Sequence, residues 1–242
     1  MANTARKQRE WQQREDLILG VARQMLLEGG YLGLNMDRIA EALEYSKGTI
    51  YQHFSCKEEV LSAICTQSLA QMADLFAQGN TFSGRTRERM MAIGEAYDLF
   101  VKFYPHHFQS SQILRTVSIR EKTSEARQQR FEAVEHRCIG IVSGIIRDGL
   151  AQGDLVLPMW ISPEQFTFGL WALSSGAHAI MAGKPLENLG IERPYDTLYA
   201  NYHIMLDGVG WQPLSHVWDY EQTRARIRQE VFRDAYRQLE LA

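Results

Sequence analysis

The stretch SKGTIYQHF, residues 46–54, is short and polar, yet its spacing predicts a helix. Gly48 lies in the first turn, and glycine costs roughly 1 kcal/mol against alanine in a helix interior. When Ile50 is placed at the centre of the buried face, the helical repeat turns Gly48 and Gln52 away from the core. The exposed side of this helix is therefore small and able to form hydrogen bonds. A helix that enters the major groove of DNA needs such a side, because its backbone must come close to the bases.

The residues just before this stretch predict a second short helix, MDRIAEAL, over 36–43. Asn35 can cap its start, and Ile39 and Leu43 form its buried edge. Ala40 is small enough for two helices to cross closely there. The two helices, joined by a short turn, have the spacing of a helix-turn-helix, in which the second helix reads the DNA.

A longer segment around these helices resembles the N-terminal DNA-binding domain of TetR-type transcriptional regulators. It is LILGVARQMLLEGGYLGLNMDRIAEALEYSKGTIYQHFSCKEEVLSAI, residues 17–64. The resemblance covers the Gly-Tyr that ends the first helix, the I-A of the second, S-K-G-T-I-Y, the H-F pair and the K-E-E-V that opens a fourth helix. It covers about the first quarter of the chain. For the remainder, the resemblance implies by analogy a helical bundle that dimerises and usually holds an effector.

The resemblance also implies which residues contact DNA. Residues at the positions of Lys47, Tyr51 and His53 mostly grip phosphates in this family, and the position of Gln52 often helps to read bases. Glutamine can bond bidentately to adenine, and the methyl group of Thr49 can contact thymine. The predicted DNA-binding residues are Asn35, Tyr45, Ser46, Lys47, Gly48, Thr49, Tyr51, Gln52, His53 and Lys57.

Three residues depart from the pattern of the family. Glu44 replaces the usual glycine of the turn, where a left-handed backbone costs a non-glycine residue about 1 kcal/mol. Tyr45 replaces a smaller apolar residue, and its hydroxyl can reach a phosphate. Cys56 replaces a capping residue beside Lys57. It is either a reactive thiol that serves as a redox switch or a tolerated substitution, with Ser55 helping to cap.

The rest of the chain has the spacing of helices, so the predicted fold class is all-α. An N-terminal three-helix helix-turn-helix domain is followed by a larger helical bundle for dimerisation and effector binding. No alternating strand pattern of useful length is present. The last helix is expected to be amphipathic and solvated, with an apolar seam of Ile227, Val231 and Leu239. Besides the two short helices, we expect helices over 11–28, 57–78, 85–103, 106–117, 122–151, 163–183, 195–209 and 217–241.

These elements divide the chain into four expected parts. Residues 1–14 form a basic N-terminal arm with four basic residues against one acidic residue, a net charge of +3. Such an arm either tracks DNA phosphates or is a solvated, disordered terminus. The helix-turn-helix domain covers 15–60, the effector-binding and dimerisation domain 61–214, and a C-terminal extension helix 215–242.

Composition limits the class of protein. The chain of 242 residues has a formal net charge of −3, so no overall basic field drives nucleic-acid binding. Its three cysteines form no CxxC pair, which suits a reducing cytoplasm. We find no apolar signal-peptide region, and no uncharged apolar run approaches the roughly 18 residues of a membrane span. A soluble cytoplasmic protein without a membrane partner is expected.

The sequence predicts no catalytic residues, no metal site and no cofactor. It contains no nucleophile motif, Gly-rich phosphate loop or plausible carboxylate pair. His106 and His107 are adjacent and would face different sides of a helix. Glu132 and His136 have metal-ligand spacing, but no third ligand is in sight.

The larger domain is expected to form a homodimer and to bind a small effector. Small residues within 169–183 allow another helix to approach closely, and helices 195–209 and 217–241 can complete a four-helix interface. The effector would be apolar or amphipathic, although most of the residues predicted to line its pocket have the spacing of plain core residues. They are Met90, Tyr97, Phe100, Phe103, Tyr104, Phe108, Trp171 and His178.

The predicted function is sequence-specific regulation of transcription. The protein would be a repressor that leaves a pseudo-palindromic operator in double-stranded DNA when a small molecule binds. An architectural or cell-cycle DNA-binding protein of the same fold, with no effector, is the alternative. A helical module for protein interactions alone is a third class. A hollow bundle favours the first interpretation and a solid core the second.

Overall fold

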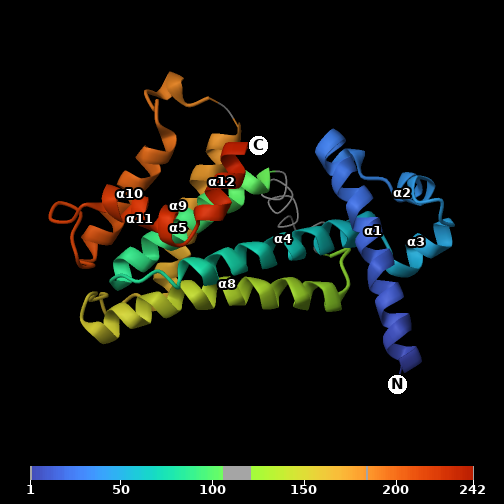
Figure 1. Ribbon diagram of the computed structural model, residues 1–242, viewed down its shortest axis with the longest axis horizontal. Coiled ribbons are helices and arrows are strands. Elements are labelled where there is room, and N and C mark those ends of the chain that lie inside the picture. Colours follow the sequence, from blue (N-terminus) through green and yellow to red (C-terminus); the bar gives the residue numbers. More distant parts are fainter. Residues whose placement is uncertain (1, 106–120, 184, 242) are drawn as a thin grey trace. The chain divides into compact units, whose positions relative to one another are not determined.

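The computed structural model describes residues 2–105, 121–183 and 185–241, and these residues form helices and no strands (Figure 1). The all-α prediction is therefore confirmed. The chain divides into two compact units. The N-terminal unit comprises Met1–Ala70 and Tyr104–Val134, and the C-terminal unit comprises Gln71–Phe103 and Glu135–Ala242. The helix expected at 106–117, with His106, His107 and Phe108, lies outside the described residues.

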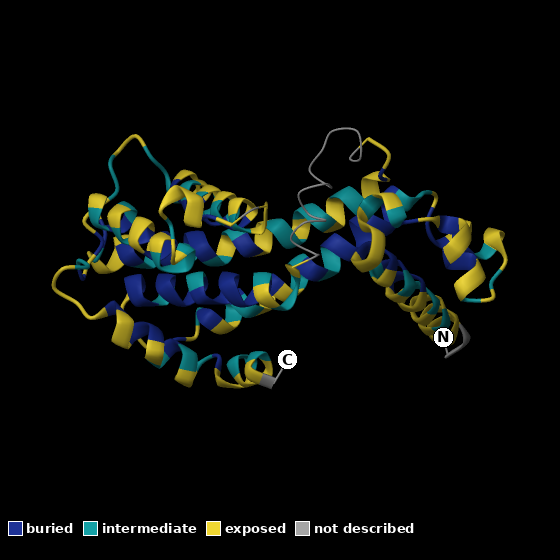
Figure 2. Cartoon of the chain, turned by 90° about the horizontal axis from the view of Figure 1, so that it is seen from above, coloured by how far each residue is buried: buried dark blue, intermediate teal, exposed yellow. Residues whose placement is uncertain are grey.

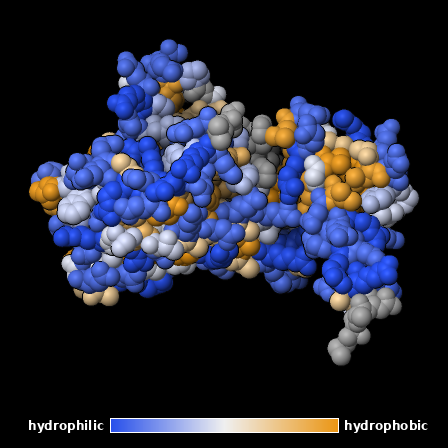
Figure 3. Space-filling view, in the orientation of Figure 1, coloured by the Kyte–Doolittle hydropathy of each residue, from blue (hydrophilic) through white to orange (hydrophobic). Residues whose placement is uncertain are grey.

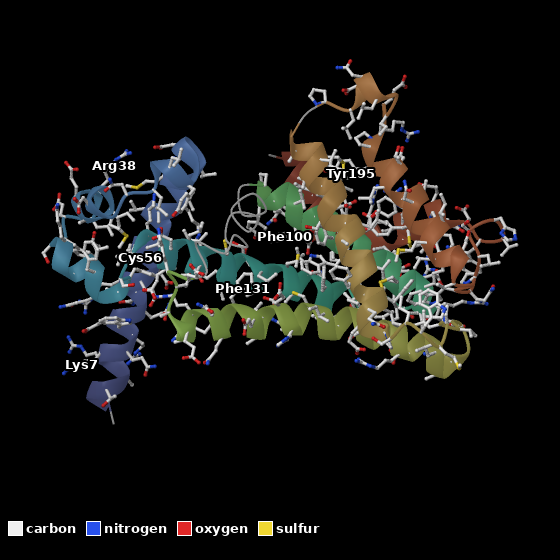
Figure 4. The ribbon with its side chains drawn as sticks, turned by 180° about the vertical axis from the view of Figure 1, so that it is seen from behind. Lys7, Arg38, Cys56, Phe100, Phe131 and Tyr195 are labelled. Carbon is white, nitrogen blue, oxygen red and sulfur yellow. The ribbon has the colours of Figure 1, made fainter. Side chains whose placement is uncertain are left out.

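The N-terminal unit is built from α1 (Ala2–Gly33), α2 (Met36–Ala42), α3 (Lys47–His53) and the first half of α4 (Lys57–Gly79). Apolar side chains from each of these helices meet in one core, and Phe131 of α8 (Glu125–Gln152) packs against it (Figure 4). Burial of this apolar face, more than helix propensity, holds two helices as short as α2 and α3. The fully or almost fully buried members of this core include Ile18, Leu19, Ala22, Ile39, Ile50, Phe54, Val60, Leu61 and Ile64.

Helix α1 is longer than the predicted 11–28, because it begins at Ala2 and continues to Gly33. The expected stop at the two glycines is present only as a kink at Gly30, which has φ 59° and ψ −160°. Residues before 11 are mostly good helix formers, and Arg6 pairs with Glu10 at 2.8 Å one turn away. These local interactions support a helix in the N-terminal arm, which the sequence had left open as a possible disordered terminus.

In the C-terminal unit, α5 (Thr86–Phe103) is buried over most of its length, as the burial colours of Figure 2 indicate for the inner helices. It packs against α9 (Pro163–Gly183) and α11 (Tyr220–Glu230). The α9 helix also packs against α10 (Pro194–Gly208), and a short 3-10 helix, Glu187–Leu189, precedes α10. The remainder of α4 and α8 and the last helix, α12 (Arg233–Leu241), complete this unit.

The prediction of one solvated helix over 217–241 is wrong. The structure has two helices, α11 and α12, and the helical path is interrupted at Phe232, whose side chain is 1% exposed. Phe232 turns inward beside Gly79, where an added Cβ would lie 3.4 Å from the ring. Arg224 and Ile227 of α11 are also buried. The sequence pattern indicated a solvated helix because the acidic partner of Arg224 lies on α5, more than 120 residues away, and is not visible in a local stretch of sequence.

Helix α4 is apolar and long enough, by length and composition alone, to cross a membrane. Within the described residues it is the single helix that passes this test. Of its most apolar stretch, 56% is buried inside the protein. The core packing of this helix accounts for its apolar composition.

Candidate nucleic-acid interface

Helix α3 presents the exposed polar face that its spacing predicts. Ser46 caps the helix, and its Oγ accepts a hydrogen bond from the Thr49 N–H at 3.1 Å. Ile50 is fully buried, whereas Tyr51 and Gln52 are exposed. Lys47 is exposed as well. The core residue therefore turns the predicted base-reading and phosphate-binding groups outward.

Gly48 leaves open space on this face. A Cβ added at Gly48 would meet a single neighbouring atom within 4 Å in the described structure, the Ser46 Oγ at 3.8 Å. Its φ is not in the left-handed region that favours glycine. No contact among the described residues therefore requires glycine at this position. A glycine here suits the close approach of DNA to the helix backbone.

The turn before α3 has the backbone expected from the sequence. Glu44 adopts a left-handed conformation with φ 54°, in place of the glycine common at this position in the family. The Tyr45 N–H donates to the Ala40 carbonyl at 3.0 Å and closes the turn. Tyr45 is half-buried against the core, so its ring supports the turn.

Helix α2 begins at the cap predicted from the sequence. The Asn35 Oδ1 accepts hydrogen bonds from the N–H groups of Asp37, at 2.9 Å, and Arg38, at 3.2 Å. Asn35 itself is exposed. The cap thus places an uncharged amide and the positive end of a helix at the surface, where phosphate groups bind readily.

An exposed ion pair joins α2 to α3. The Lys47 Nζ lies 2.6 Å from the Asp37 Oδ2, and both side chains are more than half exposed. The hydrogen bond from Lys47 to Asp37 and the charge of that carboxylate raise the pKa of the lysine. Because water surrounds both groups, the ammonium can exchange Asp37 for another anion at low cost.

His53 is set apart from the other predicted phosphate contacts. Its side chain is 7% exposed, and its ring stacks on Trp11 of α1, with centroids 3.7 Å apart and planes tilted by 31°. Burial lowers the pKa of His53, and the charge of Glu15 opposes that effect only in part. The structure therefore groups Lys47, Thr49, Tyr51 and Gln52 on one surface but leaves His53 beneath Trp11.

Lys57 and Cys56 lie at the start of α4. The Lys57 Nζ sits 4.2 Å from the centre of the Tyr31 ring, a cation–π contact that holds the ammonium near the surface. The Cys56 Sγ donates a hydrogen bond to the Lys122 carbonyl at 3.3 Å. Cys56 is half-buried and free of any disulfide. A redox role for this thiol stays a prediction.

Sequence reasoning missed two residues that position α3, Trp11 and Arg127. Arg127 donates to the His53 carbonyl at 3.2 Å and to the Glu15 carboxylate at 3.3 Å, and its guanidinium lies 4.3 Å from the Phe54 ring centre. It thereby holds the C-terminal end of α3 from a helix far along the chain. For Trp11, the available signal was an isolated aromatic residue in a polar run. Arg127 carries no local signal, since its partners are remote in sequence.

The predicted effector-pocket residues fall into different places. Met90, Tyr97, Phe100 and His178 are buried in the C-terminal unit. Phe103 and Trp171, also of this unit, are half-buried. Tyr104 belongs to the N-terminal unit, and Phe108 lies outside the described residues.

A buried contact between a histidine and an aspartate lies among the aromatic residues of the C-terminal unit. The His178 Nε2 is 3.0 Å from the Asp98 Oδ1, and its Nδ1 is 2.8 Å from the Ser174 carbonyl. The Tyr97 ring lies 5.1 Å from the His178 ring. Ser174 is in turn hydrogen bonded to the Tyr202 hydroxyl. These contacts form a polar cluster inside an otherwise apolar region.

Comparison with known proteins agrees with this geometry. Residues 18–64 match the family of bacterial regulatory proteins called the tetR family. An uncharacterized HTH-type transcriptional regulator of Mycobacterium tuberculosis is 27% identical over 167 residues, which are 69% of this chain and 74% of that protein. The HTH-type transcriptional repressor AcnR of Corynebacterium diphtheriae is 36% identical over 69 residues, which are 28% of this chain and 36% of AcnR.

A likeness among solved structures extends over both units. The TetR family regulator PfmR from Thermus thermophilus has a TM-score of 0.58 and 19% sequence identity. The match covers 78% of this chain and 97% of PfmR. At this identity the likeness concerns the fold, and part of this chain has no counterpart in PfmR.

The capped helix pair and the exposed polar face of its second helix define a helix-turn-helix protein that binds DNA. Together with the matched segment and the all-helical neighbours, they identify residues 18–64 as a DNA-binding domain of the TetR family of transcriptional regulators. Regulators of this family bind DNA and act as dimers.

Proposed function

We propose that this protein is a homodimeric repressor that binds a pseudo-palindromic operator and leaves it when a small effector binds in the C-terminal unit. The observation that carries the DNA-binding part is the outward face of α3. On that face Gln52 and Thr49 would read bases, and Lys47 and Tyr51 would hold phosphates. Asn35, Tyr45, Ser46, Gly48 and Lys57 lie around that face and serve as supporting contacts. One recognition helix gives little specificity, so two copies would read two half-sites.

The composition of α9 and the exposed apolar residues on α9 and α10 support the dimer. The sequence of α9 has no Asp, Glu, Lys or Arg after Glu164. Phe168 and Ile180 are exposed on it, and Ile204 is exposed on α10. Gly176 has open space at its Cβ position, which suits the close approach of a second copy. Gly169 has another use, because its Cβ position lies 2.8 Å from the Met205 Cε of α10 within the same chain.

The polar cluster around His178 supports the proposal that an effector binds in the C-terminal unit. Ligand sites in proteins combine apolar walls with a few well-placed polar groups. Asp98, His178 and the Tyr202 hydroxyl provide such groups among Tyr97 and neighbouring apolar side chains. A small apolar or amphipathic molecule with one polar group fits this chemistry. The proposal gives the chain no catalytic residue, cofactor, metal or membrane partner, and places it in the cytoplasm, where its three thiols stay free.

In vitro selection from a pool of randomised DNA duplexes tests the DNA-binding part. The full chain should enrich a pseudo-palindromic sequence, and mass photometry of the complex should give two copies per site. If a dimeric sample enriched no sequence, the DNA-binding part of the proposal would be wrong, and the remaining interpretation would be a helical module for protein interactions.

The effector is tested with the same selected duplex. Compounds that raise the melting temperature of the protein are added to the complex, and release of the duplex is followed by fluorescence anisotropy. Release by a stabilising compound supports the repressor mechanism. If compounds stabilise the protein without releasing DNA, or if none stabilises it, the alternative of an architectural DNA-binding protein without an effector is favoured.

A further inference from the structure

The first turns of α1 carry positive charge that the helix-turn-helix does not use. Arg6, Lys7 and Arg9 are exposed, and their helical segment projects beyond α3 toward the N-terminus (Figures 1 and 4). Figure 3 shows hydrophilic residues over this part of α1, in contrast to the hydrophobic area between α1 and α2. The charge is not a general property of the protein, which has a net charge of −3.

The stack of Trp11 on His53 fixes this segment against the recognition helix. Trp11 is 40% exposed, so the contact is made at the surface and not in the main core. His53 lies at the C-terminal end of α3, and the stack therefore connects that end to α1. Because an α-helix rises about 1.5 Å per residue, the Lys7 backbone lies ~6 Å beyond Trp11.

Lys7 lies on the side of α1 that carries Trp11 and its stack on His53. It precedes Trp11 by four residues, and residues four apart lie on the same face of a helix. Arg6 and Arg9 point in other directions, and Arg6 is already bonded to Glu10 at 2.8 Å. Glu10 is therefore the partner of Arg6, and Glu15, one turn beyond Trp11, is paired with Arg127 at 3.3 Å. The positive charge of Lys7 is thus left available beside α3.

The imidazole of His53 is left without the contact that its position implies. Neither ring nitrogen has a hydrogen-bond partner among the described residues, although the side chain is more than nine-tenths buried. Burial lowers its pKa, and the nearby Arg14 and Arg127 act in the same direction against the charge of Glu15. A neutral ring under Trp11 supplies no positive charge to a phosphate at this end of α3.

We propose that the first turns of α1 form a second phosphate-binding element, with Lys7 as its main contact, and that Trp11 positions it by stacking on His53. The ligand is the backbone of duplex DNA that flanks the base pairs read by α3. This inference rests on the proposed binding of operator DNA and adds a contact outside the helix-turn-helix. In a dimer, two such elements grip the two outer flanks of the operator.

The test compares two lengths of the selected duplex. The short one ends at the outer edges of the half-sites, and the long one adds about 10 base pairs, one helical turn, on each side. The wild-type protein should bind the long duplex more tightly. Lys7→Gln should remove roughly tenfold of affinity for the long duplex and leave the short one unchanged. With two copies per dimer, the slope of log affinity against log salt should fall by about 1.8 on the long duplex.

Arg6→Gln is the matched control, because it removes the same charge one residue away on another face of the helix. It should change the affinity for the long duplex far less than Lys7→Gln does. Equal losses of affinity for the long duplex in the two variants would show a general electrostatic attraction that does not depend on the position of the charge, and this would overturn the proposal. Equal affinity of the wild-type protein for both duplex lengths would also overturn it, while leaving the proposed function intact. Failure to bind either duplex would overturn both.

Substitutions of Trp11 test the positioning role. Trp11→Ala keeps every charge but removes the stack. Both the preference for the long duplex and the slope of log affinity against log salt should therefore decrease. Trp11→Phe keeps an aromatic ring and should restore the preference. A merely structural role would lower the melting temperature in Trp11→Ala without changing the ratio of the two affinities, and that result would contradict the proposal.

Discussion

Asp37 and Glu95 are both acidic residues that bind basic side chains, but they lie in opposite surroundings. Asp37 is on α2, at the surface, and its bond to Lys47 is surrounded by water. Glu95 is on α5, has no exposed surface, and accepts hydrogen bonds from Arg224, Arg228 and two tyrosine hydroxyls. The first pair can exchange partners when a phosphate arrives. The second must be kept, because the guanidinium of Arg224, whose side chain is 9% exposed, would lose its buried anion inside the protein.

The contacts of Glu95 explain why the C-terminal residues fold back onto α5. Arg224 donates from Nε at 2.9 Å and Arg228 from Nε at 2.9 Å, and Tyr199 donates from its hydroxyl at 2.8 Å. Tyr236 of α12 is the fourth donor. Burial by itself would raise the pKa of Glu95, but the hydrogen bonds and charge of Arg228, with those of Tyr236 and Arg224, lower it to about 2.

The largest expected effect follows from removing the buried anion. Glu95→Ala should lower the free energy of unfolding of the C-terminal unit by about 3–5 kcal/mol, because the Arg224 and Arg228 charges lose their partner. Urea unfolding followed by circular dichroism measures this. Glu221→Ala is the matched control, since Glu221 also bonds Arg224, at 3.3 Å, but has a side chain that is 84% exposed. Its loss should cost less than about 1 kcal/mol, and equal losses would contradict the comparison.

Acid should weaken the same contact gradually. The pKa of Glu95 is about 2 in the folded protein, against 4.5 for an ordinary glutamate. Its stabilising contribution is therefore fully present above pH 4.5 and is lost as the pH falls from there toward 2, by roughly 3 kcal/mol in all. The difference in unfolding free energy between the wild-type protein and Glu95→Gln isolates this contribution. A difference that stays constant between pH 5 and 2.5 would refute it.

On the recognition surface, smaller and more selective effects are expected. Gln52→Ala should reduce the preference for the selected duplex over a scrambled one by about 1–3 kcal/mol, because a bidentate base contact is lost. Tyr51→Phe, next to it, should weaken both duplexes alike, because a phosphate contact carries no base information. Competition binding with the two duplexes measures both variants. Equal losses on both duplexes for Gln52→Ala would remove its role in base reading.

The smallest expected effect is a gain. Asp37→Asn releases Lys47 and removes a negative charge beside the phosphates, so affinity for the selected duplex should rise about threefold. Glu41→Gln is a suitable control, because it removes the same charge from the exposed side of α2 without touching the ion pair. Fluorescence anisotropy at fixed salt compares the two. Weaker binding by Asp37→Asn would mean that the pair orients α3 and is not exchanged for phosphate.

Local patterns were sufficient to predict the helix-turn-helix. The buried position of Ile50, the capping role of Asn35 and the left-handed backbone at Glu44 each depend on a few neighbouring residues. Periodicity likewise placed α4 and α5 to within one residue at each end. Such features follow from backbone geometry and are visible in a short window of sequence.

Contacts between distant residues could not be predicted in this way. Arg127 reaches His53 from 74 residues away, and Arg224 reaches Glu95 from 129 residues away. Both arginines looked like solvated charges because their anions are contributed by other helices. The stack of Trp11 on His53 has the same origin, and it removed His53 from the surface on which the family pattern had placed it.

The N-terminal unit is discontinuous in sequence, and this affects how the protein can be divided. Its second part, Tyr104–Val134, contributes Lys122, which bonds Glu58 at 3.2 Å, and Ser124, which donates to Glu59 at 3.2 Å. Arg127 comes from the same part. A fragment cut after Ala70 would keep the whole recognition helix but lose these anchors. Chimeric regulators made by joining residues 1–70 to a foreign sensor would therefore need residues 121–134 transplanted as well.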